Sequence, residues 1–334
     1  MGKQFHEIAG TVQALRKIYV ETEVDQKLVP QLHRLFNVGE DGQMSHEPTR
    51  FTGGQETHGV LYIAGAGSGK TTTIQRVISE FAPLAENPET GLPRYVFTQV
   101  SSPATLKSLG LGILAKLGVE TVSERAKVWD IWNHVRHRLA VMDISLLWID
   151  EAHDMFRSAN AAELNSMLKM LKSLMQGAHP VVLILSGTEM LGDITAQDPQ
   201  NDRRFTKIMP RDLDFGVDNE QVDALVQHYA DKAGLKVRLG DDLSNRLIYA
   251  SRFRFGRMVD YLIHAIEAAL IRDAGSLEME DFAEAWAAQE SCAPHENLFE
   301  RHDWADIPLD RIAKEHAEAV SSKSASTRKA RKKK

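Results

Sequence analysis

Cysteine is almost absent from this chain of 334 residues, in which Cys292 is the only one, so no internal disulfide can form. Such low cysteine use is typical of a reducing compartment, which predicts a cytoplasmic protein in which Cys292 is a bystander thiol. Long hydrophobic runs are also lacking. The longest, such as residues 181–185, are far shorter than the ~20 residues that span a bilayer, and the first residues lack the apolar core of a signal peptide. We therefore expect no membrane partner.

Acidic residues exceed basic ones by 46 to 40, but the basic residues are unevenly spread. Residues 323–334 contain seven Lys and Arg and no Asp or Glu, which leaves 33 basic residues against 46 acidic ones elsewhere. A basic tail on an acidic body favours an anionic partner, either nucleic acid or an acidic protein surface. A disordered end that only aids solubility is the alternative, and composition does not separate the two.

The most specific motif is AGAGSGKTT at residues 64–72, which lies between an apolar run and a helix-like pattern. A strand, a glycine-rich turn and a helix in this order are typical of a phosphate-binding loop, whose backbone N–H groups hold an anion at the helix N-terminus. Lys70 would reach the β- and γ-phosphates of ATP, and the Thr71 hydroxyl would ligate Mg²⁺. The expected nucleotide contacts come from Ala66, Gly67, Ser68, Gly69, Lys70, Thr71 and Thr72. Ala64 departs from the strict pattern, which has glycine there, and we expect this to be tolerated.

Strand-like and helix-like segments alternate around this loop. The expected strands are 60–64, 94–100, 145–150, 180–186 and a last one near 208–215, and the expected helices are 70–81, 103–117, 123–141 and 161–176. Nearly continuous apolar strands separated by helices are typical of a parallel sheet covered on both faces. The fold class is therefore α/β, with a nucleotide-binding core at residues 58–216.

The flanking regions lack this alternation. Residues 1–57 contain two helical patterns, 7–18 and 24–36, and then a polar, glycine-rich connector. Residues 217–291 contain helical patterns at 218–234, 240–250, 256–273 and 278–290, which predicts a small all-α lid domain. Residues 292–334 are expected to be an irregular C-terminal segment with the basic tail.

A second motif, LLWIDEAHD at residues 146–154, ends an apolar strand in two carboxylates. In nucleotide hydrolases this position lies beside the phosphate loop, so Asp150 would hold Mg²⁺ and Glu151 would activate the attacking water. The letters DEAH suggest a helicase. Such helicases need two tandem cores and only one fits here, so we expect His153 to be a surface or core-edge residue.

Two further elements follow. Ser186 or Thr188, at the end of the next strand, would hydrogen-bond the γ-phosphate or the attacking water, unless both are ordinary turn residues. Arg203 or Arg204, in the segment DRRF, would reach the γ-phosphate of a neighbouring subunit and stabilise transition-state charge. A surface ion pair is the alternative for these arginines.

Basic residues in two other places are weaker candidates. Arg257, after Gly256 in the lid, would contact phosphate and couple lid closure to the nucleotide, with Arg254 as the less favoured choice. Thr105 and Lys107, which follow the second strand, would bind a DNA phosphate. Helix-surface arginines and ordinary helix capping are the alternative interpretations.

The order of these motifs resembles that of an AAA+ ATPase, and within that superfamily the chain is similar to the TniB/TnsC group of DNA-transposition regulators. The segments that carry the resemblance are 19–36, 63–75, 100–118, 146–155 and 183–191. The resemblance implies ATP and Mg²⁺ as cofactors, and a homo-oligomeric ring or helical filament on double-stranded DNA. It also implies a transposase and a TniQ-like target-selection protein as partners, with ATP hydrolysis driving disassembly.

Two other functions compete with this one. An initiator or helicase-loader ATPase of DNA replication or repair would share the same core, although residues 291–334 are too short and polar for the winged-helix domain that such proteins carry. A nucleotide-gated scaffold that does not hydrolyse ATP would not need the Asp150-Glu151 pair.

Overall fold

The computed structural model describes residues 2–100, 104–119, 121–123, 125–156, 161–238, 240 and 242–309. It divides the chain into two compact units, of which one is Val20–Arg211 and the other combines Met1–Tyr19 with Asp212–Lys334. The segment expected as one N-terminal extension, 1–57, is thus split between the units. The basic tail at 323–334 lies outside the described residues.

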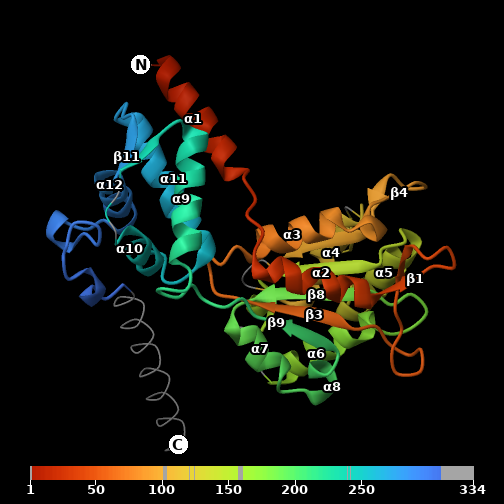
Figure 1. Cartoon of the computed structure of the whole chain (residues 1–334). Helices are drawn as coiled ribbons and strands as arrows, with labels where there is room; N and C mark the ends of the chain where they lie inside the picture. Colours follow the sequence, from red (N-terminus) through yellow and green to blue (C-terminus); the bar gives the residue numbers. More distant parts are fainter. Residues whose placement is uncertain are drawn as a thin grey trace, which may run out of the picture. The chain divides into compact units, whose positions relative to one another are not determined.

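The unit Val20–Arg211 is built on a five-stranded parallel sheet (Figure 1). Its strands, in spatial order, are β6 (Tyr95–Gln99), β7 (Leu146–Asp150), β8 (Val182–Gly187), β3 (Gly59–Ile63) and β9 (Phe205–Ile208). The register places Gln99 opposite Asp150, and Tyr62 opposite both Ser186 and Ile208. The predicted parallel sheet is confirmed.

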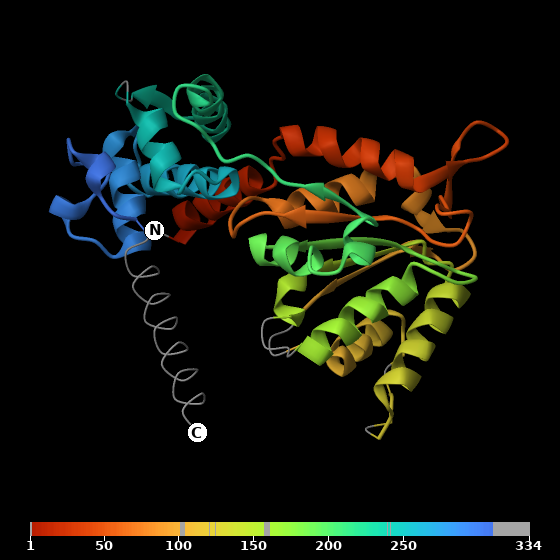
Figure 2. The same cartoon turned by 90° about the horizontal axis from the view of Figure 1, so that it is seen from below.

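Alternate residues of the strands pack into two separate hydrophobic layers, one on each face of the sheet. Val60, Tyr62 and Trp148 pack with helices α2 (Glu23–Leu35) and α3 (Lys70–Glu80). Leu61 and Ile63 face the opposite layer, which contains α4 (Leu106–Lys116), α5 (Val128–Val141) and α6 (Ala161–Leu174). Figures 1 and 2 show these helices on the two sides of the sheet. The period-2 alternation of a strand therefore builds a three-layer sandwich, and α2 is part of it.

Two predictions about strands of this unit were wrong. The last strand is β9, Phe205–Ile208, rather than a strand near 208–215, because Phe205 and Ile208 are buried while Met209 is exposed and Pro210 follows. The connector 38–57 contains much of an antiparallel hairpin, β1 (Phe36–Val38) with β2 (Met44–Pro48). The remaining elements are η1 (Ala82–Leu84), β4 (Glu86–Asn87), β5 (Leu92–Pro93), η2 (Ala152–Met155), α7 (Glu189–Thr195) and α8 (Pro199–Asp202).

The other unit is mainly helical. It contains α1 (Gly2–Arg16), α9 (Asn219–Ala233), α10 (Leu243–Ala250), α11 (Phe255–Ile271) and α12 (Met279–Glu290), with α1 packed on α9 and α11. It also has one short parallel ladder of β10 (Lys236–Arg238) and β11 (Ser276–Glu278), which the all-α prediction did not include. No helix in the described ranges is long and apolar enough to cross a membrane.

Residues 292–309 are part of this helical unit. They contain η3 (Pro294–Glu296) and η4 (Trp304–Asp306), and the side chains of Leu298 and Phe299 are buried. The Arg246 guanidinium donates hydrogen bonds to the carbonyls of Leu298 and Arg301 at 2.6 and 2.7 Å. The described part of the segment expected to be irregular is therefore packed against the lid.

Candidate nucleotide-binding site

The phosphate loop joins β3 to α3, and its glycines are required by backbone geometry. Gly67 and Gly69 have φ angles of 77° and 87°, which lie in the left-handed region that favours glycine. The backbone of Ala64 does not have a left-handed conformation, and the residue is buried. Its N–H donates to the Gly187 carbonyl at 2.9 Å. An alanine is tolerated at position 64 because the residue there extends the strand. Lys70 is the first residue of α3, so the loop lies at a helix N-terminus.

Asp150 is held rigidly at the carboxyl end of β7. Its Oδ2 accepts a hydrogen bond from the Thr71 hydroxyl at 2.8 Å, and its Oδ1 accepts one from the Glu151 N–H at 2.9 Å. The side chain is 2% exposed. A hydroxyl and a carboxylate oxygen at this distance are ligands that Mg²⁺ accepts, so the two residues fit the expected metal site.

Ser186 has a different position from the one predicted. Its side chain is fully buried, donates to Asp150 Oδ1 at 2.6 Å and accepts from Trp148 Nε1 at 2.8 Å. It therefore orients Asp150 instead of facing a phosphate. The neighbouring candidate, Thr188, is half-buried at the N-cap position of α7, where its side chain makes no capping hydrogen bond.

Glu151 lies between two basic side chains. Its Oε1 is 2.9 Å from Lys70 Nζ, and its Oε2 is 3.3 Å from His153 Nδ1. Glu151 has a φ of 52°, an uncommon conformation for a residue other than glycine. The prediction that His153 lies at the surface or the core edge gave no hint of this contact with Glu151.

Arg203 and Arg204 share Glu56, a residue of the predicted connector. Arg204 is 2% exposed, and its guanidinium donates to Glu56 Oε2 and to the Gln200 carbonyl. Arg203 donates to Glu56 Oε1 at 2.8 Å while its side chain is 53% exposed. Burial alone would raise the pKa of Glu56, but hydrogen bonds from Arg204 and Thr52 hold that pKa below its usual value. Arg204 is thus a buried structural residue, and Arg203 is the one presented at the surface.

The predicted lid arginines lie in the helical unit. Arg257, in the first turn of α11, has its Nη2 3.8 Å from Glu290 Oε1. Glu290 also pairs with Arg252, whose Nη1 lies 3.0 Å from the same oxygen. Arg254 precedes α11 and forms an ion pair with Asp212. Each predicted arginine therefore has an acidic partner within its own unit.

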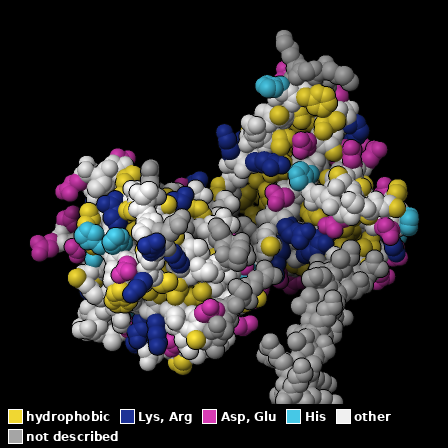
Figure 3. Space-filling model, turned by 180° about the vertical axis from the view of Figure 1, so that it is seen from behind, with side chains coloured by type: hydrophobic (Ala, Val, Ile, Leu, Met, Phe, Trp, Pro, Cys, Tyr) yellow, Lys and Arg dark blue, Asp and Glu magenta, His cyan; other side chains and the backbone are white. Residues whose placement is uncertain are grey.

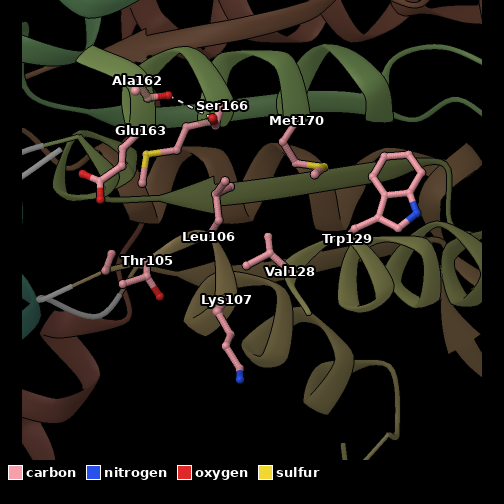
Figure 4. A pocket seen from close by; sticks show the side chains of 11 residues that line it. Thr105, Leu106, Lys107, Val128, Trp129, Ala162, Glu163, Ser166 and Met170 are labelled. Atoms are coloured by element: carbon pink, nitrogen blue, oxygen red, sulfur yellow. Dashed lines mark hydrogen bonds between the residues drawn. The ribbon is translucent and has the colours of Figure 1, made fainter. Parts of the chain in front are cut away.

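The candidate DNA-contacting residues border a groove of about 720 Å³ lined by α4, α5 and α6. Figure 4 shows Thr105 and Glu163 at one end of this groove and Trp129 with Met170 at the other. Thr105 is the N-cap of α4 and forms a capping box with Ser108, so the capping interpretation describes its contacts. Lys107 is half-buried. The groove is lined by no residue of the phosphate loop.

Comparisons with known proteins match both the sequence and the fold. A family model described as "Bacterial TniB protein" matches residues 51–212. The Aeropyrum pernix ORC2 protein, solved as ADPNP-ADP complexes, is 16% identical with a TM-score of 0.56, over 84% of this chain and 74% of that chain.

Two other solved structures have a similar likeness. The Cdc6p of Pyrobaculum aerophilum is 14% identical with a TM-score of 0.56, over 86% of this chain and 75% of that chain. The Aeropyrum pernix ORC1 protein, solved in complex with DNA, is 14% identical with a TM-score of 0.55, over 85% and 72%. A search of curated proteins gave no match. At these identities the solved structures establish a common fold, that of AAA+ proteins.

Proposed function

Because residues 51–212 of this chain belong to the TniB family and adopt the AAA+ fold, we propose that the protein is an ATPase that assembles on duplex DNA and regulates transposition. The observation that carries the enzymatic part is the cluster of Lys70, Thr71, Asp150 and Glu151. Two short contacts, 2.8 Å between Thr71 and Asp150 and 2.9 Å between Lys70 and Glu151, link the phosphate loop to the end of β7.

Each residue of the cluster has a separate role in this proposal. The loop from Ala66 to Thr72 holds the triphosphate, with Lys70 on its β- and γ-oxygens. Thr71 and Asp150 hold Mg²⁺, which neutralises charge on the phosphates when it is bound. Ser186 keeps Asp150 oriented. Glu151 accepts the proton of the attacking water, and Thr188, which directly follows β8, senses the γ-phosphate.

The subunit interface and the lid complete the proposed mechanism. Arg203 of one subunit stabilises the transition-state charge on the ATP of its neighbour in a ring or filament. Arg257 couples the lid to the nucleotide after leaving Glu290. Loss of the γ-phosphate then weakens the interface, so hydrolysis leads to disassembly and release of DNA.

DNA binding and protein partners rest on the family. Lys107 and Thr105 would contact DNA phosphates at the start of α4. Several Lys and Arg side chains lie on the face of the Val20–Arg211 unit seen in Figure 3, with hydrophobic side chains between them. The partners in this proposal are a transposase and a TniQ-like target-selection protein.

Assembly on DNA is the first test of this proposal. Imaging and sedimentation of the protein with duplex DNA, Mg²⁺ and a slowly hydrolysed ATP analogue should show ordered oligomers that dissociate as salt rises. Lys70→Ala should weaken nucleotide binding by roughly 10- to 100-fold, because it removes a charge-assisted contact, and should prevent assembly at limiting nucleotide. Lys116→Ala, in the last turn of α4, is the matched control. A wild-type protein that stays monomeric on DNA with the analogue would exclude the proposal.

The role of Arg203 in trans predicts a specific result in mixtures of subunits. Arg203→Ala should leave nucleotide affinity unchanged in dilute monomers and lower turnover in assemblies by about 10³-fold, the effect of a missing arginine finger. At saturating ATP, mixing this variant with Lys70→Ala, which keeps Arg203, should restore part of the turnover. Phosphate release measured across mixing ratios provides the readout. If the mixture has no more activity than its components, Arg203 does not act on a neighbour.

A replication initiator or helicase loader is the second candidate function, because the solved structures with this fold include ORC and Cdc6 proteins. The two functions differ in their partners. Co-purification from cells with a replicative helicase would favour the second function, whereas co-purification with a transposase would favour the first.

A further inference from the structure

His153 is the one titratable residue of the DEAH segment, residues 150–153, that no role above uses. It lies in η2, directly after Glu151, and its side chain is only 12% exposed. Its Nδ1 is 3.3 Å from Glu151 Oε2, and its Nε2 is 3.7 Å from Asp154 Oδ1. The imidazole therefore lies between two carboxylates, and one of them belongs to the proposed general base.

The Nδ1 atom is buried and has no hydrogen-bond partner among the residues that the structure describes. Its 3.3 Å contact with Glu151 is within ion-pair distance but lacks hydrogen-bond geometry. A buried nitrogen left without a partner destabilises the folded protein, so such atoms usually gain a partner in some state of the protein. A small rotation of the Glu151 carboxylate would complete the bond.

Lys70 holds the other oxygen of the same carboxylate. Its Nζ lies 2.9 Å from Glu151 Oε1, within a largely buried environment. A triphosphate in the loop competes for this ammonium, because it carries more negative charge than one carboxylate. When Lys70 turns to the phosphates, Glu151 Oε1 loses its cation while Oε2 still faces His153.

The end of β8 fixes the imidazole from the opposite side. A Cβ atom added to Gly187 would lie 3.0 Å from His153 Nδ1 and 3.4 Å from the His153 backbone nitrogen. Only glycine at position 187 leaves room for the His153 ring where it now lies. The next residue is Thr188, the candidate for sensing the γ-phosphate, so His153 lies between that strand end and Glu151.

We propose that His153 is the positioning residue for Glu151. When ATP engages Lys70, the Nδ1–H of His153 donates to the Glu151 carboxylate and orients it toward the attacking water. The bond requires a proton on Nδ1, which either the Nδ1–H tautomer or the imidazolium supplies. This inference rests on the proposed ATPase function. It adds a residue outside the Lys70, Thr71, Asp150 and Glu151 cluster.

The kinetic test compares two substitutions at His153. His153→Ala should lower kcat for ATP about tenfold and leave KM within twofold, since the imidazole touches the base and not the nucleotide. His153→Asn should recover most of the rate, because its amide N–H can donate from near the position of Nδ1. Gly187→Ala, which crowds the ring, should give an intermediate loss. His137→Ala, at an exposed position of α5, is the control.

A readout without turnover comes from the ¹⁵N shifts of the His153 ring. Adding Mg²⁺ and a slowly hydrolysed ATP analogue should shift Nδ1 in the wild type and leave it unchanged in Glu151→Ala. In a Glu151→Gln background, His153→Ala should change the remaining turnover less than twofold. An unchanged ring signal in the wild type, or a His153→Ala rate within twofold of wild type, would overturn the inference.

The outcome separates this inference from the proposed function. If the wild type hydrolyses ATP but does not assemble on DNA, the proposed role in transposition is excluded. The kinetic comparison of the His153 variants then still tests whether His153 positions Glu151. A wild type with no ATP turnover under any condition overturns both.

Discussion

Glu151→Gln is expected to lower ATP turnover by roughly 100-fold or more, the contribution of a positioned general base. Nucleotide affinity should stay the same or increase, because the carboxylate that now pairs with Lys70 at 2.9 Å loses its charge and frees the ammonium. Assemblies on duplex DNA should therefore form with ATP itself and persist. Phosphate release, affinity for a fluorescent ATP analogue and the lifetime of assemblies after dilution measure the three effects.

Glu80→Gln is the matched control, because Glu80 lies at the far end of α3 from the loop and pairs with the exposed Arg76. It should change turnover by less than twofold. If Glu151→Gln keeps a tenth or more of the wild-type rate, Glu151 is not the base. If turnover falls but assemblies dissociate as fast as in the wild type, hydrolysis does not drive disassembly.

Arg204→Ala is expected to destabilise the protein by about 3–5 kcal/mol, because it leaves the carboxylate of Glu56 buried without its main partner. Glu56 and Arg204 are each 2% exposed, and the pair joins the start of β9 to the segment before β3. Arg203→Ala is the control. Its side chain is half-exposed, so its removal should cost about 1 kcal/mol or less. Denaturant unfolding of both variants measures the difference.

The pH dependence of this difference has a definite sign. The pKa of Glu56 lies below its usual value in the folded protein, so the wild type gains stability above the unfolded pKa of about 4.3 and loses it as the pH falls. In Arg204→Ala, burial without the guanidinium raises that pKa, so folding costs free energy at neutral pH and this cost disappears on acidification. The stability gap between the two proteins should therefore narrow from pH 7 toward pH 4. A gap that stays constant would show that Glu56 is not its cause.

The nucleotide motifs could be predicted because they are local in sequence. The glycines of the loop, Lys70 at the start of a helix and the carboxylates after an apolar strand follow from spacing and strand periodicity. The sheet follows from the same alternation. The parallel order also implied that the end of β7 would lie beside the loop, and the contact between Thr71 and Asp150 agrees with that expectation.

What could not be predicted depends on contacts between distant segments. The arginines of DRRF look equivalent in sequence, yet only Arg204 points inward, because Glu56 meets it from 148 residues away. In sequence Ser186 looks like an exposed residue at a strand end. In the structure its hydroxyl is hydrogen-bonded to Asp150 and Trp148 of the adjacent strand. A useful signal for Ser186 was present, since a small polar residue on a strand beside the acidic one lies within reach of its carboxylate.

Helix α1, which ends at Arg16, belongs to a unit whose other helices begin only at Asn219. During translation Val12 and Leu15, which are buried in the finished protein, leave the ribosome long before α9 and α11 exist. At roughly 5–20 residues per second, α1 waits about 10–50 seconds until α11 is complete. The sheet unit can fold in that interval, so the last step of folding is the capture of the first helix by the last part of the chain. A nascent chain stalled before residue 255 would lack α11 and leave the face of α1 that carries Val12 and Leu15 without this partner, which makes this segment a natural place for a chaperone to bind.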